Sequence, residues 1–426
     1  MNVQLHSPQQ TATPIEAEYR RRTKRSRELF ERAEKVIPGG NSRHSVYWEP
    51  YPLFISRAAG TKLIDADNNE YLDLTYNYTA MVHGHAYPPI LEAVEIARGT
   101  GWAANCEQMI DVAEQLTNRV ESVDQVRFTN SGTEAAMAAL QVARTLTGRH
   151  KILMPRYGYH GALHEHESGT FDHPGPATFV AEYNNLESFE AVLQEHGHEI
   201  AAVFAEPVLG SAGIVPAESE FIRGLRNAAQ RAGALFVVDE VIAFRLSTGG
   251  FQKTLDVTPD LTMFGKLIGG GFPVGALGGR KDLMDVFDPA DLKAFHSGTF
   301  NANPVTMAAG AASIRDLTTD RIDRMHALAA RLETGARQAA ARLDLPFEVS
   351  RVGSLLNFFF QKEQPESNMN REDLAVMNQF HLSCLNHGLF IARRGLAVMC
   401  TLMDESITDE AAQRLSAAMT DLAHQI

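Results

Sequence analysis

The central part of the chain alternates short, β-rich apolar runs with amphipathic helical patterns. Helical patterns occupy residues 131–148 and 221–233. The β-rich runs are residues 125–130 (QVRFTN), 151–155 (KILMP), 201–207 (AAVFAEP), 234–240 (ALFVVDE) and 261–266 (LTMFGK). This alternation is typical of βαβ units. We therefore predict an α/β fold in which helices cover a mostly parallel sheet.

The length of the chain and the character of its two flanks predict a second, smaller domain. At 426 residues the chain is longer than a usual single domain, and its 44% hydrophobic content is enough to bury a large core. The N-terminal flank is charged and helical, and the C-terminal flank mixes helix with strand-like runs. We expect residues 71–315 to form the large domain. Residues 1–70 and 316–426 are predicted to build a small α+β domain together.

Composition and the N-terminal sequence limit which binding partners and which cellular compartment we expect for the protein. The chain carries 39 basic and 52 acidic residues, a net charge of −13, which argues against nucleic acid and anionic membranes as partners. The first residues lack the apolar core of a secretory signal, so a cytoplasmic location is expected. Three cysteines, at 106, 384 and 400, lack CxxC-type spacing, which argues against a disulfide framework and a zinc site.

Polar residues stand at the ends of four predicted strands. They are Asn130-Ser131, Glu206, Asp239 and Lys266. In an open parallel sheet, ligands bind outside the carboxyl ends of the strands. Because four strands deliver polar groups to this edge, we expect the ligand site there.

Residues 131–133 (SGT) lie where a strand leads into a helix. The free backbone N–H groups and positive dipole of a helix start favour a phosphate. Taken alone, Ser131 and Glu134 also form the pattern of a capping box. Capping and phosphate binding are compatible at one helix start.

Asp239 follows five apolar residues and is predicted to be buried, where an unpaired carboxylate is unfavourable. A protonated heterocyclic nitrogen would be a suitable partner; a helix cap or a structural salt bridge is the alternative. The next residue, Glu240, is expected to be the more solvated of the two.

Lys266 lies within an apolar, glycine-rich run, LTMFGKLIGGG. Desolvation lowers the pKa of a lysine, so that its neutral amine can attack a carbonyl and form a Schiff base. The alternative is a lysine whose amine reaches water past an apolar surface. A reactive lysine, a carboxylate for a ring nitrogen and a phosphate site are together the requirements of pyridoxal 5′-phosphate (PLP).

The chain resembles class III aminotransferases of PLP fold type I in motifs of the same order and spacing. They are FTNSGTEAAMAALQVAR (128–144), YHG (159–161), AEPVLG (205–210), FVVDEV (236–241), TPDLTMFGKLIGGGFPVGALGGR (258–280) and HSGTFNANPVTMAAG (296–310). The resemblance covers nearly the whole chain and is closest to glutamate-1-semialdehyde aminomutases and β-amino-acid aminotransferases. It implies a seven-stranded-type, mostly parallel sheet in the large domain.

The resemblance implies a role for each motif residue that meets the cofactor. Lys266 would hold PLP as a Schiff base and then shuttle a proton. Asp239 would pair with the pyridine nitrogen, and Ser131, Gly132 and Thr133 would hold the phosphate.

Five further residues would complete the cofactor site by the same resemblance. Tyr159 and Val241 would lie on the two faces of the ring, and His160 and Glu206 would support its surroundings. Thr299 would reach the phosphate of the neighbouring subunit's cofactor, which implies a homodimer. The histidines at 160, 164 and 166 superficially resemble a metal cluster, but PLP chemistry needs no metal and none is expected.

Two arginines are the candidates for a substrate carboxylate, because a guanidinium binds carboxylates bidentately. Arg43 in NSRHSVYW and Arg394 in RRGLAVM lie in segments that resemble the β-amino-acid branch. We therefore expect ping-pong transamination from an amino acid, preferably a β-amino acid, to a keto acid such as 2-oxoglutarate or pyruvate. The alternatives are glutamate-1-semialdehyde aminomutase, a racemase or decarboxylase on the same fold, and a non-catalytic relative.

Overall fold

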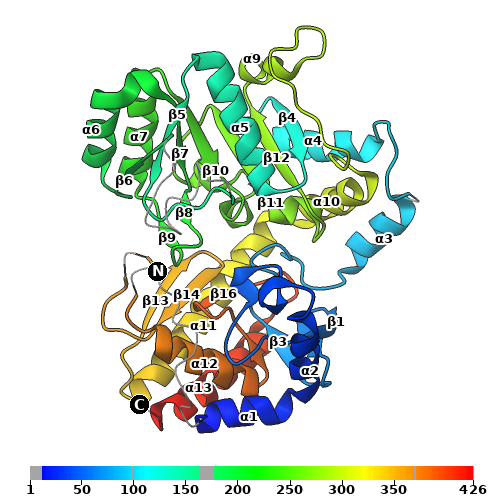
Figure 1. Ribbon diagram of the computed structural model, residues 1–426, viewed down its shortest axis with the longest axis vertical. Helices are drawn as coiled ribbons and strands as arrows, with labels where there is room; N and C mark the ends of the chain where they lie inside the picture. Colours follow the sequence, from blue (N-terminus) through cyan, green and yellow to red (C-terminus); the bar gives the residue numbers. More distant parts are fainter. Residues whose placement is uncertain (1–11, 98, 163–176, 366, 369–370, 426) are drawn as a thin grey trace.

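A seven-stranded sheet forms the centre of the upper part of the computed structural model in Figure 1, which describes residues 12–97, 99–162, 177–365, 367–368 and 371–425. In spatial order the strands are β4 (Gln125–Thr129), β12 (Gly275–Gly279), β11 (Leu261–Gly265), β10 (Leu235–Asp239), β7 (Ile200–Ala205), β5 (Lys151–Pro155) and β6 (Thr178–Ala181). Only β12 is antiparallel to its neighbours. The predicted mostly parallel seven-stranded sheet is confirmed.

Five of the seven strands coincide with the β-rich runs of the sequence, whereas β6 and β12 were not predicted. β12 reads GALGG, a composition with little preference for a strand. Its glycine at 275 has a packing reason, because a Cβ there would lie 2.0 Å from the carbonyl oxygen of Ser131. The strand therefore passes directly against the start of the helix α5 (Gly132–Thr147), of which Ser131 is the N-cap.

Helices cover both faces of this sheet, which explains the uninterrupted apolar runs. On β10, Val237 packs in the cluster that contains α5 (Gly132–Thr147). Its neighbours Phe236 and Val238 pack on the other face in the cluster that contains α6 (Leu186–His196) and α7 (Ser219–Arg231). Because successive side chains of a strand point to opposite faces, burial of both faces requires apolar residues at consecutive positions.

Further elements surround the sheet. They are α3 (Pro88–Ala97), α4 (Glu107–Arg119), α8 (Phe251–Thr254), α9 (Lys281–Met284), α10 (Pro304–Asp316), the 3₁₀ turns η5 (Ala243–Leu246) and η6 (Lys266–Gly269), and the short hairpin of β8 (Val208–Leu209) and β9 (Val215–Pro216). Helix α10 packs against α3 and α4. These helices lie on the right of the sheet in Figure 1.

Both ends of the chain meet in the lower part of the structure, where blue and red segments lie side by side (Figure 1). Its elements are α1 (Pro14–Arg22), α2 (Lys24–Ala33), β1 (Ile55–Ala59), β2 (Lys62–Asp65), β3 (Glu70–Asp73), α11 (Thr319–Arg342), β13 (Glu348–Val352), β14 (Leu355–Phe359), α12 (Leu374–Asn386), β15 (Leu389–Phe390), β16 (Leu396–Val398) and α13 (Glu405–Ala423). Strand β15 extends the N-terminal sheet by pairing in parallel with β3. The domain boundaries at 70/71 and 315/316 stay predictions. Within the described residues, no helix is long and apolar enough to cross a membrane.

Candidate active site

A cavity of about 360 Å³ lies at the carboxyl edge of the large sheet. Its lining contains residues that end or immediately follow β4, β7, β10 and β11. They are Asn130 and Ser131, Glu206, Asp239 and Lys266. The structure thus brings together the four polar strand ends, as expected for an open sheet.

Lys266 directly follows β11 and begins the 3₁₀ turn η6. Its φ of 50° lies in the left-handed region, which is unusual for a residue with a side chain. Burial lowers the pKa of its amine, although the carboxylates of Asp239 and Glu206 act in the opposite direction. A larger share of the amine is therefore neutral than in water, which is the nucleophilic form.

Asp239 ends β10 with a side chain that is almost fully buried, and each of its two carboxylate oxygens has a partner within the chain. Its Oδ1 accepts a bond of 2.9 Å from the Val241 amide, and its Oδ2 lies 2.9 Å from His160 Nδ1. Within the chain, the partner of this buried carboxylate is thus the imidazole of His160. His160 orients the carboxylate, which still lines the cavity and could pair with a ring nitrogen.

The expectation that Glu240 is solvated was wrong, because its side chain is 0% exposed. It points to the start of α8 and accepts bonds from the amides of Phe251 (3.1 Å) and Gln252 (2.7 Å). Burial raises the pKa of Glu240 to about 7, although these amides oppose that effect. Two adjacent carboxyl groups therefore serve different elements, one the cavity and one a helix start.

Ser131 and its neighbours form the junction between β4 and α5. Ser131 Oγ accepts a bond of 3.1 Å from the Glu134 amide, and Glu134 Oε2 accepts one of 2.7 Å from the Asn130 amide. This capping leaves the first amides of the helix, at Gly132 and Thr133, without an intrahelical partner. Both residues line the cavity, so the junction could hold a phosphate.

The loop that carries Tyr159 is attached to the buried carboxyl group of Glu206. The Tyr159 amide donates to Glu206 Oε1 (2.9 Å), and Glu206 Oε2 accepts from the Gly210 amide (3.0 Å). Burial raises the pKa of Glu206 to about 7. The Tyr159 side chain is 42% exposed and lines the cavity together with Val241, whose methyl groups lie close to Gly132. A flat ligand could lie between them.

Thr299 is exposed and lines neither this cavity nor the one described next. The same loop is connected to the site through Asn301, whose Oδ1 accepts a bond of 2.7 Å from Asn130 Nδ2. The fold of one chain therefore does not bring Thr299 to the other predicted residues. Of the predicted metal-like cluster, His164 and His166 lie outside the described residues.

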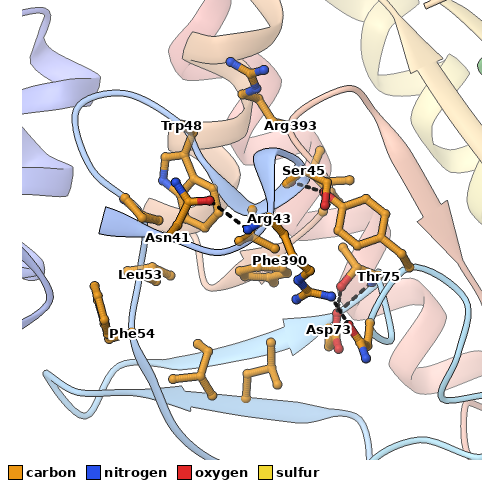
Figure 2. A pocket seen from close by; sticks show the side chains of 18 of the residues that line it. Asn41, Arg43, Ser45, Trp48, Leu53, Phe54, Asp73, Thr75, Phe390 and Arg393 are labelled. Atoms are coloured by element: carbon orange, nitrogen blue, oxygen red, sulfur yellow. Dashed lines mark hydrogen bonds between the residues drawn. The ribbon is translucent and has the colours of Figure 1, made fainter. Parts of the chain in front are cut away.

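A second cavity, of about 510 Å³, lies among segments from both ends of the chain. Figure 2 shows its lining, in which Arg43 lies next to Phe390, with Trp48, Leu53 and Phe54 to the left, while the Arg393 side chain extends away at the top. Asn77 lines both cavities and accepts a bond of 3.0 Å from Arg43 Nη1.

The two candidate arginines differ in position. Arg43 lines the second cavity, whereas Arg394 lines neither cavity and its neighbour Arg393 lines the second one. All three guanidinium groups lower the pKa of the Tyr78 phenol, although burial is the larger effect and raises it. Three positive charges therefore surround Tyr78.

Sequence reasoning missed Asn77 and Arg393. Asn77 is part of an ordinary polar-aromatic stretch, TYNYT, with no motif around it. For Arg393 a signal existed in the Arg-Arg pair, but the sequence does not show which of two adjacent residues lines a cavity.

The groups in the smaller cavity fit PLP. One cavity holds a lysine amine of lowered pKa, a buried carboxylate oriented by an imidazole, and the start of a 16-residue helix. These match an aldehyde, a pyridine nitrogen and a phosphate, respectively. Gly132 lets the helix start pack closely against Val241, because a Cβ there would lie 3.2 Å from Val241 Cγ2.

Comparison with known proteins agrees with this chemistry. The family model of class III aminotransferases matches residues 45–423. The chain is 37% identical over 392 residues to the glutamate-1-semialdehyde 2,1-aminomutase of Ignicoccus hospitalis, covering 86% of this chain and 92% of that relative. It is 37% identical over 403 residues to the β-phenylalanine transaminase of Variovorax paradoxus, covering 90% of each. Among solved structures, an ω-transaminase from Sphaerobacter thermophilus matches with a TM-score of 0.89 and 38% identity, covering 93% of this chain and 97% of that one. The chain is an enzyme of the class III aminotransferase family, whose cofactor is pyridoxal 5′-phosphate.

Proposed function

We propose that this aminotransferase moves the amino group of a β-amino acid to a keto acid such as 2-oxoglutarate or pyruvate, in two ping-pong half-reactions. One observation carries the proposal. Arg43 lies in the wall of an apolar cavity beside the lysine cavity and forms no ion pair with a carboxylate of the described residues. A guanidinium in this setting favours a ligand that combines a carboxylate with an apolar group.

The cofactor-site residues divide the chemistry between them. PLP, when bound, supplies an aldehyde that takes up the amino group and a ring that accepts electrons from the substrate carbon. We propose that Lys266 Nζ removes the proton from the carbon that bears the amine and delivers a proton to the cofactor C4′. Asp239, oriented by His160, keeps a proton on the pyridine nitrogen, and Ser131 to Thr133 hold the phosphate.

The same proposal places Tyr159 and Val241 on the two faces of the cofactor ring. Tyr159 would stack on one face, and its loop is held by the bond from its amide to Glu206. Val241 would contact the other face, and its own amide is bonded to Asp239. The Asp239 carboxyl group and the Val241 side chain, which would contact the ring, are therefore linked by a hydrogen bond and would move together.

The substrate carboxylate is proposed to bind Arg43 when the donor is a β-amino acid. In a β-amino acid the carboxylate lies one carbon further from the amine than in an α-amino acid. An arginine across Asn77 from the lysine cavity suits that longer separation. The α-carboxylate of the keto acid is assigned to Arg393, which lines the second cavity. Arg394, the candidate from the sequence, lines neither cavity and adds a neighbouring positive charge. The apolar wall around Phe390 accepts the donor side chain.

A half-reaction without acceptor tests this proposal. The PLP-loaded protein is incubated with single α-, β- or ω-amino acids, and loss of the visible cofactor absorbance is recorded. We expect β-amino acids with apolar side chains to react fastest. A protein that turns over glutamate 1-semialdehyde without any keto acid would instead be an aminomutase, the activity named for the relative from Ignicoccus hospitalis. Reaction with α-amino acids alone would contradict the β-amino acid assignment.

We also propose a homodimer in which Thr299 of each subunit completes the partner's phosphate site. Several large apolar side chains are exposed on α3, α4, α5 and the segments beside them. They are Leu91, Ile96, Trp102, Ile110, Met137, Phe295 and Phe300. Exposed apolar residues in such number indicate a protein interface, and a second copy is the occupant that brings Thr299 to a site.

Mixed dimers test this assignment. Subunits with Lys266→Ala and subunits with Thr299→Ala are mixed and allowed to exchange. If Thr299 acts across the interface, one site in each mixed dimer has both Lys266 and Thr299, so activity at limiting PLP rises above that of either parent. If Thr299 acts within its own subunit, mixing restores no complete site. A monomer by light scattering would contradict the proposal directly.

A further inference from the structure

Four consecutive residues after β3 adopt left-handed backbone conformations. Tyr76, Asn77, Tyr78 and Thr79 have φ values of 42°, 51°, 53° and 77°. Residues with side chains avoid this region, so a run of four persists only when its surroundings hold it in place. Strain of this kind, observed in a wall of the active site, directs attention to what the segment presents.

Two buried groups hold the segment at its ends. At the start, Asp73 Oδ1 accepts bonds from the amides of Thr75 (2.7 Å) and Tyr76 (3.1 Å). At the end, Arg245 Nη1 donates to the Thr79 carbonyl (3.3 Å), and the same guanidinium also bonds the Met399 carbonyl. Arg245 is 0% exposed, and burial lowers its pKa to about 10. Its hydrogen bonds thus join two segments that are remote from each other in sequence.

The segment presents Asn77 and Tyr78 to the loop that carries Arg43. Asn77 Oδ1 accepts a bond of 3.0 Å from Arg43 Nη1, and the Tyr78 hydroxyl donates to the Ser45 carbonyl. The Arg43 amide in turn donates to Asn41 Oδ1 (3.0 Å). The Arg43 guanidinium is therefore oriented by the side chain of Asn77, a residue that lines both cavities.

The chemical nature of this contact is informative. An amide oxygen accepts a hydrogen bond from a guanidinium but carries no net charge, so the positive charge remains available. A carboxylate at the same place would pair with Arg43 and neutralise it. Within the described part of the chain, Arg43 forms no such ion pair, and the residue is exposed in the lining of the second cavity.

From this geometry we propose that Asn77 is a positioning residue: it orients the Arg43 guanidinium toward the substrate carboxylate while leaving its charge unpaired. This inference rests on the proposed function, in which Arg43 binds that carboxylate. A purely conformational role for Asn77 is the competing explanation, because asparagine tolerates the left-handed region better than most residues. Aspartate and glycine tolerate it as well, and this property makes a discriminating test possible.

Three variants separate the two explanations. Asn77→Asp keeps the shape and the backbone tolerance but adds the charge that would pair with Arg43. Asn77→Gly keeps the backbone tolerance and removes the hydrogen bond. Arg43→Gln removes the guanidinium and reports whether that residue binds the carboxylate at all.

Two donors that differ only in the carboxylate provide the first measurement. They are β-phenylalanine and 1-phenylethylamine, each assayed with the PLP-loaded enzyme. In Asn77→Asp we expect the ratio of the Michaelis constants, β-phenylalanine over 1-phenylethylamine, to rise about tenfold or more, as for loss of a charge-assisted contact. Asn77→Gly should raise the ratio by less, because its Arg43 loses orientation but keeps its charge. A general disturbance of the site would raise both constants alike.

Calorimetry with 3-phenylpropanoate provides a second measurement that needs no turnover. Its dissociation constant should rise in the order wild type, Asn77→Gly, Asn77→Asp. A value for Asn77→Asp that equals the wild-type value, or does not exceed that of Asn77→Gly, overturns the inference. If Arg43→Gln binds 3-phenylpropanoate as tightly as the wild type does, the carboxylate does not bind Arg43, and the proposed function fails as well.

Discussion

The two cavities of this aminotransferase contrast in how their charges are satisfied. In the lysine cavity the carboxyl groups of Asp239 and Glu206 accept hydrogen bonds from Val241, His160, Tyr159 and Gly210. In the second cavity Arg43 has a neutral amide as its side-chain partner among the described residues, beside an apolar wall. Groups already held by the protein suit a permanent cofactor, and an unpaired charge suits a substrate that comes and goes.

The two cavities also differ in origin. The lysine cavity is built at one edge of a single sheet, by residues that end its strands. The second cavity combines residues 40–85 with residues 381–393, which are far apart in the sequence. We therefore propose that the lysine cavity determines the type of reaction and that the second cavity determines the choice of substrate. Mutations in one cavity should change one of these properties without the other.

The largest effect is expected from Lys266→Ala. Loss of the proton-transferring amine should lower the rate of the donor half-reaction about 10³-fold or more, since positioned acid–base groups contribute about 10²–10⁴-fold. Single-turnover absorbance measurements check this. Lys253, an exposed lysine of the same sheet-containing part, provides the control, and Lys253→Ala should behave as the wild type. A small effect of Lys266→Ala would contradict the assignment of the reaction to the cavity that Lys266 lines.

A smaller loss is expected from Asp239→Asn, which keeps the shape and removes the charge. The amide stabilises a protonated ring nitrogen less well, so the half-reaction should slow by about 10²-fold for every donor alike. The measurement compares β-phenylalanine with 1-phenylethylamine. An effect confined to one donor would contradict the division between the two cavities.

Arg43→Gln, unlike Asp239→Asn, should affect the two donors unequally. Loss of the guanidinium should raise the Michaelis constant of β-phenylalanine by about 10–100-fold, corresponding to about 1.5–3 kcal/mol for a hydrogen bond to a charged group. Steady-state kinetics with both donors check this, and 1-phenylethylamine should be affected much less. Arg393→Gln is the matched variant in the same wall. If Arg393→Gln alone shows the effect, the carboxylate binds on the other side of the cavity.

The smallest effect is expected in stability, from Glu240. Because its folded pKa of about 7 lies above the value of 4.5 for a free glutamate, the folded protein holds this proton more tightly than the unfolded chain. Its contribution to the free energy of unfolding therefore decreases as pH rises from about 4.5 to 7, by roughly 3 kcal/mol at most. Thermal melts across this range should show a flatter pH profile for Glu240→Gln. The exposed Glu121 is the control, and Glu121→Gln should keep the wild-type profile.

The predictable parts of the molecule were those encoded by neighbouring residues. The strand around Asp239 and the helix start at Ser131 are each specified within about ten positions, and both lie where the sequence predicts. The outward or inward direction of Glu240 was not predictable, because α8 supplies its hydrogen bonds only after folding. For the same reason Asn77 gave no signal: its importance depends on Arg43, which lies 34 positions away.

The β12 strand was missed for a related reason. Its GALGG sequence has poor strand preference, and what makes it a strand is the narrow space between β4 and β11, including the approach of Ser131 to Gly275. Tertiary packing of this kind overrides local preference. Patterns within a segment are thus a guide to elements with their own preference, and a poor one to elements defined by their neighbours.

The buried Arg245 lies six positions after Asp239 and donates to the backbone carbonyls of Thr79, in the segment after β3, and of Met399, directly after β16. It thereby joins the strand that ends in the cofactor carboxylate to the wall that carries Asn77. Under the proposed function, the interval between Lys266 and Arg43 is the length that a donor must span from amine to carboxylate. Under that proposal, the buried Arg245 sets the distance between the position that receives the donor's amine, at Lys266, and the position that receives its carboxylate, at Arg43.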